Sequence, residues 1–92
     1  MPYIHIDKRE KYKESIAKLV ETLRQTAVDE GGFPVGDLNF VFSSIIYRTF
    51  EENRTYKCAN AMMGVLECVK QEFYRRKVAI LEGEKARENG DI

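Results

Sequence analysis

The feature that most constrains the fold is the length of the last amphipathic pattern in the sequence. Apolar residues at helical spacing begin near Thr55 and continue to at least Leu81, and the pattern reaches Glu88 if the charged end is included. A helix of about 27 to 33 residues is about 40 to 50 Å long, because each residue adds about 1.5 Å. Gly64 lies inside this pattern, where it marks either a close crossing with another helix or a kink.

A shorter helix is predicted over residues 8–27. Asp7 is placed to cap its N-terminus, and Glu10 follows at the spacing of a capping box. Gly31-Gly32 and Pro34 then end the helical pattern. Its apolar side chains recur along one face: Tyr12, Ile16, Leu19, Val20, Leu23 and Ala27.

A second short helix is predicted over residues 38–52, with Asp37 as its N-cap after Gly36. The face expected to lie in the core comprises Leu38, Val41, Phe42, Ile45, Ile46, Thr49 and Phe50. The sequence therefore predicts an all-α fold: one helical domain, residues 1–92, forming a three-helix antiparallel bundle with a long C-terminal helix (helices at about 8–27, 38–52 and 55–88). The first two helices would be only about 30 and 20 Å long, so the third overhangs them, and we expect the bundle to assemble as an oligomer.

The second helix also carries aromatic residues on its back. At about 100° per residue, Phe40 and Tyr47 fall together about 180–200° from Leu38. Ser43 and Ser44 beside them are small enough to let another helix approach. A helix that is apolar on two faces is usually covered on both. We favour covering by another subunit, so these four residues are the predicted oligomer interface; covering by the chain's own termini and simple exposure are the alternatives.

The stretch "GVLECVKQEFYRRK" raises the question of a binding site. Glu67, Lys70 and Tyr74 form a carboxylate–ammonium–phenol row beside the apolar stripe of the third helix. Glu72 and Arg76, four residues apart, are predicted to pair on the other flank. In the favoured interpretation the row is a structural edge in which Glu67 and Lys70 pair with each other or with a neighbouring helix. In the alternative, Glu67, Lys70, Tyr74 and Arg76 bind a ligand such as a phosphate.

Catalytic and metal-binding patterns are weak. The single histidine, His5, precedes the helices, which argues against a catalytic triad, and no Cys, His or carboxylate cluster has the spacing of a zinc site. Acids from facing helices could hold magnesium, but none converge within one chain. Cys58 and Cys68 are ten residues apart on one predicted helix, about 15 Å along its axis, so we expect both to be reduced. We expect no cofactor, and enzymatic activity is not favoured.

Composition and charge argue against other classes of protein. Lysine plus arginine and aspartate plus glutamate number 15 each, and this balance argues against a nucleic-acid-binding protein. The longest apolar run, "AMMGVL", is far shorter than the roughly 20 residues that span a membrane, and the N-terminus lacks the apolar segment of a signal peptide. We therefore expect a cytoplasmic protein without membrane contact.

The segments "GDLNFVFSSIIYR", "GVLECVKQEFYRR" and "ENGD", together with the opening "MPYI", run almost from end to end of the chain. With them the chain resembles a family of short, uncharacterised proteins from phages, bacteria and archaea. The family tends to have Ala-Pro-Tyr-Glu where this chain has Ala79-Ile80-Leu81-Glu82. Without that proline, a longer last helix is favoured here. The resemblance implies no activity.

Taken together, these features predict a small helical protein-interaction module that associates with itself as a homodimer or higher oligomer, and that binds or organises another protein. The alternative is a ligand- or phosphate-binding helical protein or a magnesium-dependent nucleotide hydrolase.

Overall fold

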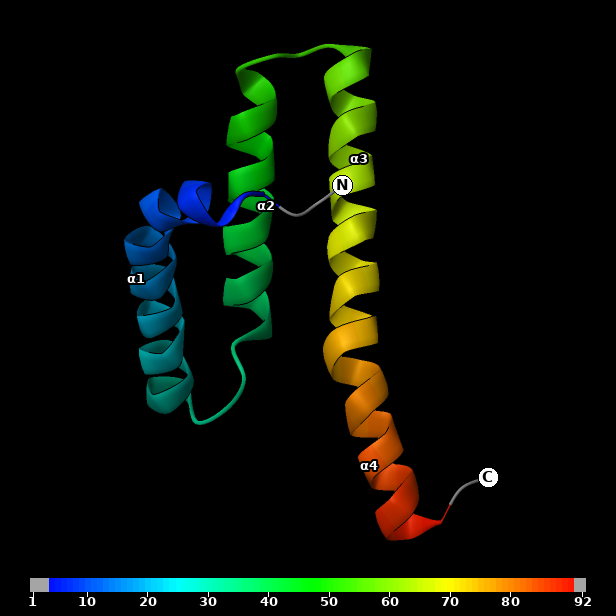
Figure 1. The fold of residues 1–92 in the computed structure, drawn as a ribbon. Helices are drawn as coiled ribbons and strands as arrows, with labels where there is room; N and C mark the ends of the chain where they lie inside the picture. The colour runs from blue at the N-terminus through cyan, green and yellow to red at the C-terminus, as the bar shows by residue number, and fades with distance from the viewer. Residues whose placement is uncertain (1–3, 91–92) are drawn as a thin grey trace. The chain divides into compact units, whose positions relative to one another are not determined.

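The computed structural model describes residues 4–90, and this part of the chain consists of helices joined by short turns, without strands (Figure 1). Its elements are α1 (Ile6–Glu30), α2 (Val35–Glu51), α3 (Tyr56–Phe73), a π-helical turn η1 (Tyr74–Val78) and α4 (Ala79–Asn89). α3, η1 and α4 follow one another without a break and form a single helix of 34 residues, which we call the long helix. The predicted all-α class with three helices, the third of them long, is confirmed.

The chain divides into two units at residue 53. In the first unit α1 and α2 run in opposite directions from the turn at residues 31–34, and we call this pair the hairpin (Figure 1). The second unit is the long helix.

The N-terminus of α1 differs from its prediction. Asp7 is not the N-cap, because the helix already begins at Ile6 and the Nδ1 atom of His5 accepts a hydrogen bond from the Asp7 backbone N–H at 3.3 Å. The helix also continues past Ala27 to Glu30. It ends there because Gly31 adopts a left-handed conformation (φ 72°), which a residue without a Cβ atom adopts easily.

α2 also begins earlier than predicted, at Val35 rather than at Leu38. Pro34 precedes the helix and its carbonyl accepts a hydrogen bond from the Leu38 N–H at 2.9 Å. A helix start tolerates proline because the first N–H groups have no partner within the helix. Asp37 is therefore not the N-cap but lies inside the first turn, where its carboxylate faces the positive end of the helix dipole.

The long helix follows its prediction closely. Thr55 is the N-cap, and its hydroxyl accepts a hydrogen bond from the Cys58 N–H at 3.1 Å. The helix passes through Gly64 without interruption, and a Cβ atom added there would meet nothing within 4 Å. The kink predicted for Gly64 is therefore absent, because α3 is continuous through this residue; the predicted close crossing with another helix stays a prediction. The helix ends at Asn89, before Gly90 with φ 85°.

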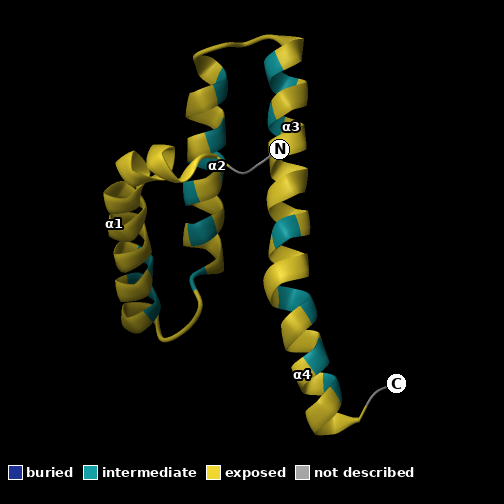
Figure 2. Ribbon diagram, in the orientation of Figure 1, coloured by how far each residue is buried: buried dark blue, intermediate teal, exposed yellow. Residues whose placement is uncertain are grey.

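Neither unit has a core of its own. No residue in the described range is buried, and on α1 the half-buried residues lie near its C-terminal end (Figure 2). The apolar stripe predicted for α1 is 40–57% exposed from Tyr12 to Val20. On the long helix Leu66, Val69 and Phe73 are 42%, 56% and 61% exposed. The apolar faces identified in the sequence are thus present and lie open within each unit.

Replacing Gly64 by alanine should stabilise the protein. Alanine has the higher helix propensity, and no neighbouring atom obstructs its methyl group, so the free energy of unfolding should rise by about 0.5–1 kcal/mol. Urea denaturation followed by circular dichroism, at one protein concentration, measures the change. Gly31→Ala is the matched control and should lower the stability by about 1 kcal/mol, because its φ is positive. Destabilisation by Gly64→Ala would instead mean that another helix approaches Gly64.

Candidate functional site

The predicted oligomer interface lies on α2. Phe40 and Tyr47 are 73% and 67% exposed, and Ser43 and Ser44 beside them are half-buried. The Ser43 hydroxyl donates a hydrogen bond to the Asn39 side chain at 3.3 Å. Since Phe40 and Tyr47 are seven residues apart on one regular helix, they lie on the same face two turns apart. This face thus offers two large aromatic side chains with small hydroxyl groups between them.

Phe40 also borders a groove that runs between α1 and α2. The groove has a volume of about 280 Å³. It is lined by Leu19, Thr22, Leu23, Thr26, Gly36, Asp37, Phe40 and Val41. Both helices contribute apolar side chains to the lining, and the Asp37 carboxylate and the two threonines make the rest of it polar.

A second, more apolar groove lies on the other side of Leu23. Its volume is about 220 Å³, and it is lined by Val20, Leu23, Arg24, Ala27, Phe33, Pro34 and Leu38. Sequence reasoning missed both grooves. For the second groove, the available signal was the sequence "GGFP", which places an aromatic residue, Phe33, in the turn between the two helices.

The predicted polar row of the long helix does not form one converging site. The Glu67 carboxylate accepts a hydrogen bond from Gln71 at 3.0 Å rather than pairing with Lys70. The Tyr74 hydroxyl donates to Glu82 at 2.6 Å. Arg76 lies on the other flank, where it pairs with Glu72 as predicted. Glu67, Tyr74 and Arg76 therefore bond to three different residues of the same helix rather than to one another.

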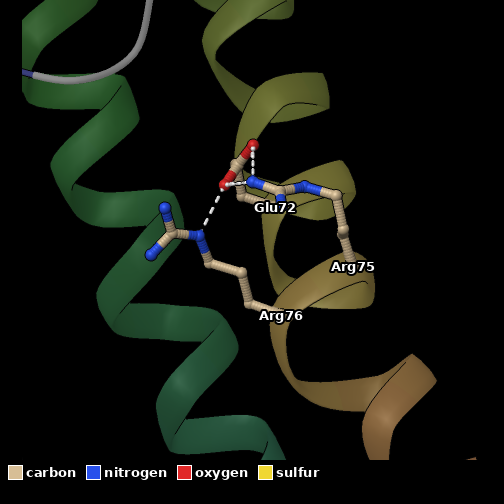
Figure 3. A network of polar contacts seen from close by, with 3 residues as sticks. All are labelled: Glu72, Arg75 and Arg76. Carbon is tan, nitrogen blue, oxygen red and sulfur yellow. Dashed lines mark hydrogen bonds and ion pairs between the residues drawn. The ribbon is translucent and has the colours of Figure 1, made fainter.

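Glu72 is the centre of the polar network drawn in Figure 3. Arg75 donates to both of its carboxylate oxygens, at 3.0 and 2.8 Å, and Arg76 donates to one of them at 2.9 Å (Figure 3). The Glu72 side chain is 29% exposed, and the two arginines are more than half exposed. The Glu72 carboxylate can bind both guanidinium groups of the "EFYRR" segment, because it lies three and four residues before them, and it offsets one of their two positive charges.

The π turn explains why Tyr74 reaches a residue eight positions away. In a regular α-helix, residues eight apart are separated by about 80° around the axis. A π turn contains about one residue more than an α turn, so the residues after it are set back by about 100°. Tyr74 and Glu82 consequently fall within about 20° of each other and can bond. The hydrogen bond to Glu82, and then the negative charge of that carboxylate, raise the pKa of Tyr74 above its ordinary value of 10.0.

The structure provides no metal-binding cluster or membrane-spanning element in the described range. Among residues 4–90, no three His, Cys, Asp or Glu side chains gather closely enough to hold a metal ion. No helix in this part of the chain combines the length and the apolar character that crossing a membrane requires. Cys58 and Cys68 are free thiols.

Removing the charge of Glu82 should lower the pKa of Tyr74. The pKa is raised because losing the phenol proton would break the hydrogen bond to Glu82 and place two negative charges side by side. The Tyr74–Glu82 hydrogen bond is therefore intact at neutral pH and is lost as the pH rises through the raised pKa. In Glu82→Gln the midpoint of Tyr74 ionisation should move down toward 10.0. Nuclear magnetic resonance of ring-labelled tyrosine measures it, with Tyr74→Phe to assign the signal. Glu84→Gln should leave the midpoint in place; an equal shift there would contradict the specific contact.

The comparisons with known proteins agree with the sequence resemblance. A family model described as a domain of unknown function (DUF6899) matches residues 1–92. No curated protein and no solved structure matches the chain. Because the family model covers the chain from end to end, the chain belongs to the DUF6899 family of domains of unknown function.

Proposed function

We propose that this chain is a protein-interaction module that works as a homo-oligomer. The observation that carries the proposal is the open apolar surface of both units: no described residue is buried, although each helix bears a stripe of large apolar side chains. Such surface is costly to leave in water, at about 25 cal/mol for each Å². Contiguous apolar patches of this kind usually mark sites of protein association.

The amount of surface supports association. The chain exposes 8440 Å², whereas a compact monomer of its mass, 10.7 kDa, exposes about 5500 Å². The difference of about 2900 Å² is surface that the contacts within each unit leave exposed. Obligate homodimers bury about 2000 to 5000 Å² in total at their interfaces, so a second copy can account for a large share of it.

The lengths of the helices limit what one chain can cover. The hairpin is no longer than α1, which has 25 residues and is about 38 Å long. The long helix has 34 residues and is about 51 Å long. The long helix is thus about 13 Å, or more than two turns, longer than the hairpin. Within this proposal, a second copy covers the apolar side chains that this excess length leaves exposed.

Within this proposal, the face of α2 with Phe40, Ser43, Ser44 and Tyr47 forms the contact between copies. Its two aromatic side chains supply apolar area, and the serines between them allow the backbones of two helices to come close. The groove beside Phe40 gives this face a depression into which an aromatic side chain of the second copy fits.

Light scattering coupled to size exclusion should give a mass at least twice 10.7 kDa at tens of micromolar, and Tyr47→Glu should weaken the assembly. Burying an aromatic side chain is worth about 1.5–3 kcal/mol, so its loss should raise the dissociation constant by about tenfold or more. Tyr56→Glu is the matched control, because Tyr56 is 91% exposed at the start of α3, and it should leave the mass unchanged.

A monomer for the unmodified chain would refute the proposed function. Equal effects of Tyr47→Glu and Tyr56→Glu would leave self-association standing but would place the contact on a face other than that of Phe40 and Tyr47.

The alternative, a phosphate-binding or nucleotide-hydrolysing protein, has less support. Tyr74 and Arg76 already bond to Glu82 and Glu72, so an anion would have to displace a carboxylate from each. We expect thermal melting with nucleotides and magnesium to show no shift beyond the scatter of replicates. A ligand present at a hundred times its dissociation constant would stabilise the protein by about 2.7 kcal/mol and raise the melting temperature by several degrees. A reproducible rise that Lys70→Ala abolishes would support the alternative instead.

A further inference from the structure

Four residues around the start of α4 are spaced symmetrically along the helix, with one charged residue on each side of an aliphatic pair. Lys77 lies three and four residues before Ile80 and Leu81, and Glu84 lies four and three residues after them. Residues three and four apart are neighbours on a helix surface. The result is one face with a cation at one end, an acid at the other and two aliphatic side chains between them, which we call the α4 face.

The α4 face is uncovered within the long helix. Ile80 and Leu81 are 58% and 52% exposed. In the described part of the chain neither Lys77 nor Glu84 forms an ion pair, whereas several neighbouring charges are paired locally: Glu72 with Arg75 and Arg76, and Lys85 with Glu88. The charges at the two ends of the α4 face are thus available to groups outside the long helix.

The hydrogen-bonded side chains of Tyr74 and Glu82 lie on the side of the helix opposite the α4 face. At about 100° per residue, Glu82 lies about 100° from Leu81 and about 200° from Ile80, so it points to the far side of α4. The Tyr74–Glu82 hydrogen bond therefore occupies the side opposite the α4 face. No polar side chain of this pair stands between Ile80 or Leu81 and an approaching helix.

We propose that the α4 faces of two copies pack against each other in antiparallel orientation, about a two-fold axis between Ile80 and Leu81. This inference rests on the self-association proposed above and adds a second contact to it. A two-fold contact brings the same patch of each copy together. Here it places Ile80 of one copy against Leu81 of the other, and Lys77 of each copy beside Glu84 of the other.

Charge selects the orientation. A parallel pair would set Lys77 against Lys77 and Glu84 against Glu84, whereas the antiparallel pair forms two opposite-charge contacts from the same residues. The face spans only about two turns, which is small beside the about 800 Å² that each partner contributes to a standard interface. It therefore determines the register and direction of pairing more than the total affinity.

Reversing and then exchanging the two charges tests the proposal. Lys77→Glu alone, or Glu84→Lys alone, turns both cross-copy attractions into repulsions. Because two attractions become two repulsions, each single variant should raise the dissociation constant about tenfold in sedimentation experiments at low salt. The double variant K77E/E84K should return it to within about threefold of the unmodified value. An equimolar mixture of the two single variants should associate as the unmodified chain does.

Lys57→Glu is the matched control, with the same change of charge near the other end of the long helix, and should have no effect. Circular dichroism checks that each variant remains helical. Single variants that bind as tightly as the unmodified chain, or a double variant as weak as the singles, would overturn the antiparallel α4 contact. If the chain still assembles and Tyr47→Glu still disrupts it, the proposed function survives that result; a monomeric unmodified chain would overturn both.

Discussion

The uninterrupted helix from Tyr56 to Asn89 determines what the rest of the molecule must do. A helix satisfies its own backbone hydrogen bonds but cannot bury its own apolar stripe. Most of the stability of protein helices comes from packing such a stripe against something else. The hairpin is the only other described element, and it is shorter than the long helix. The association proposed here has its physical basis in this apolar stripe, which belongs to a helix longer than the hairpin.

Much of the fold could be predicted from the sequence because its signals are local. The threonine cap at Thr55 and the glycine at residue 90 bound the long helix almost as predicted. The caps at Asp7 and Asp37 were wrong for a common reason: an acidic residue suits both the cap and the first turn of a helix, and spacing alone does not distinguish them. α1 and α2 begin earlier than predicted, because His5 is the N-cap of α1 and Pro34 is the N-cap of α2.

The polar groups were harder to predict. The Glu72–Arg76 pair follows from four-residue spacing and was predicted, whereas the second ion pair of Glu72, with Arg75, was not. The Tyr74–Glu82 bond could not be derived, because it depends on a π turn that no residue in "YRRKV" announces. Every angular position assigned beyond Tyr74 assumed a regular α-helix and is therefore displaced. The identity of a partner is encoded in surface chemistry rather than in periodicity, so it lies beyond such reasoning.

The π turn also has a mechanical consequence. One extra residue between α3 and α4 turns the second half of the rod by about a quarter of a revolution relative to the first. The apolar stripe of the long helix is therefore divided into two parts, one on α3 and one on α4, that face different directions. The long helix can then contact one neighbouring helix along α3 and a different one along α4. A change in one of these contacts would not require a change in the other.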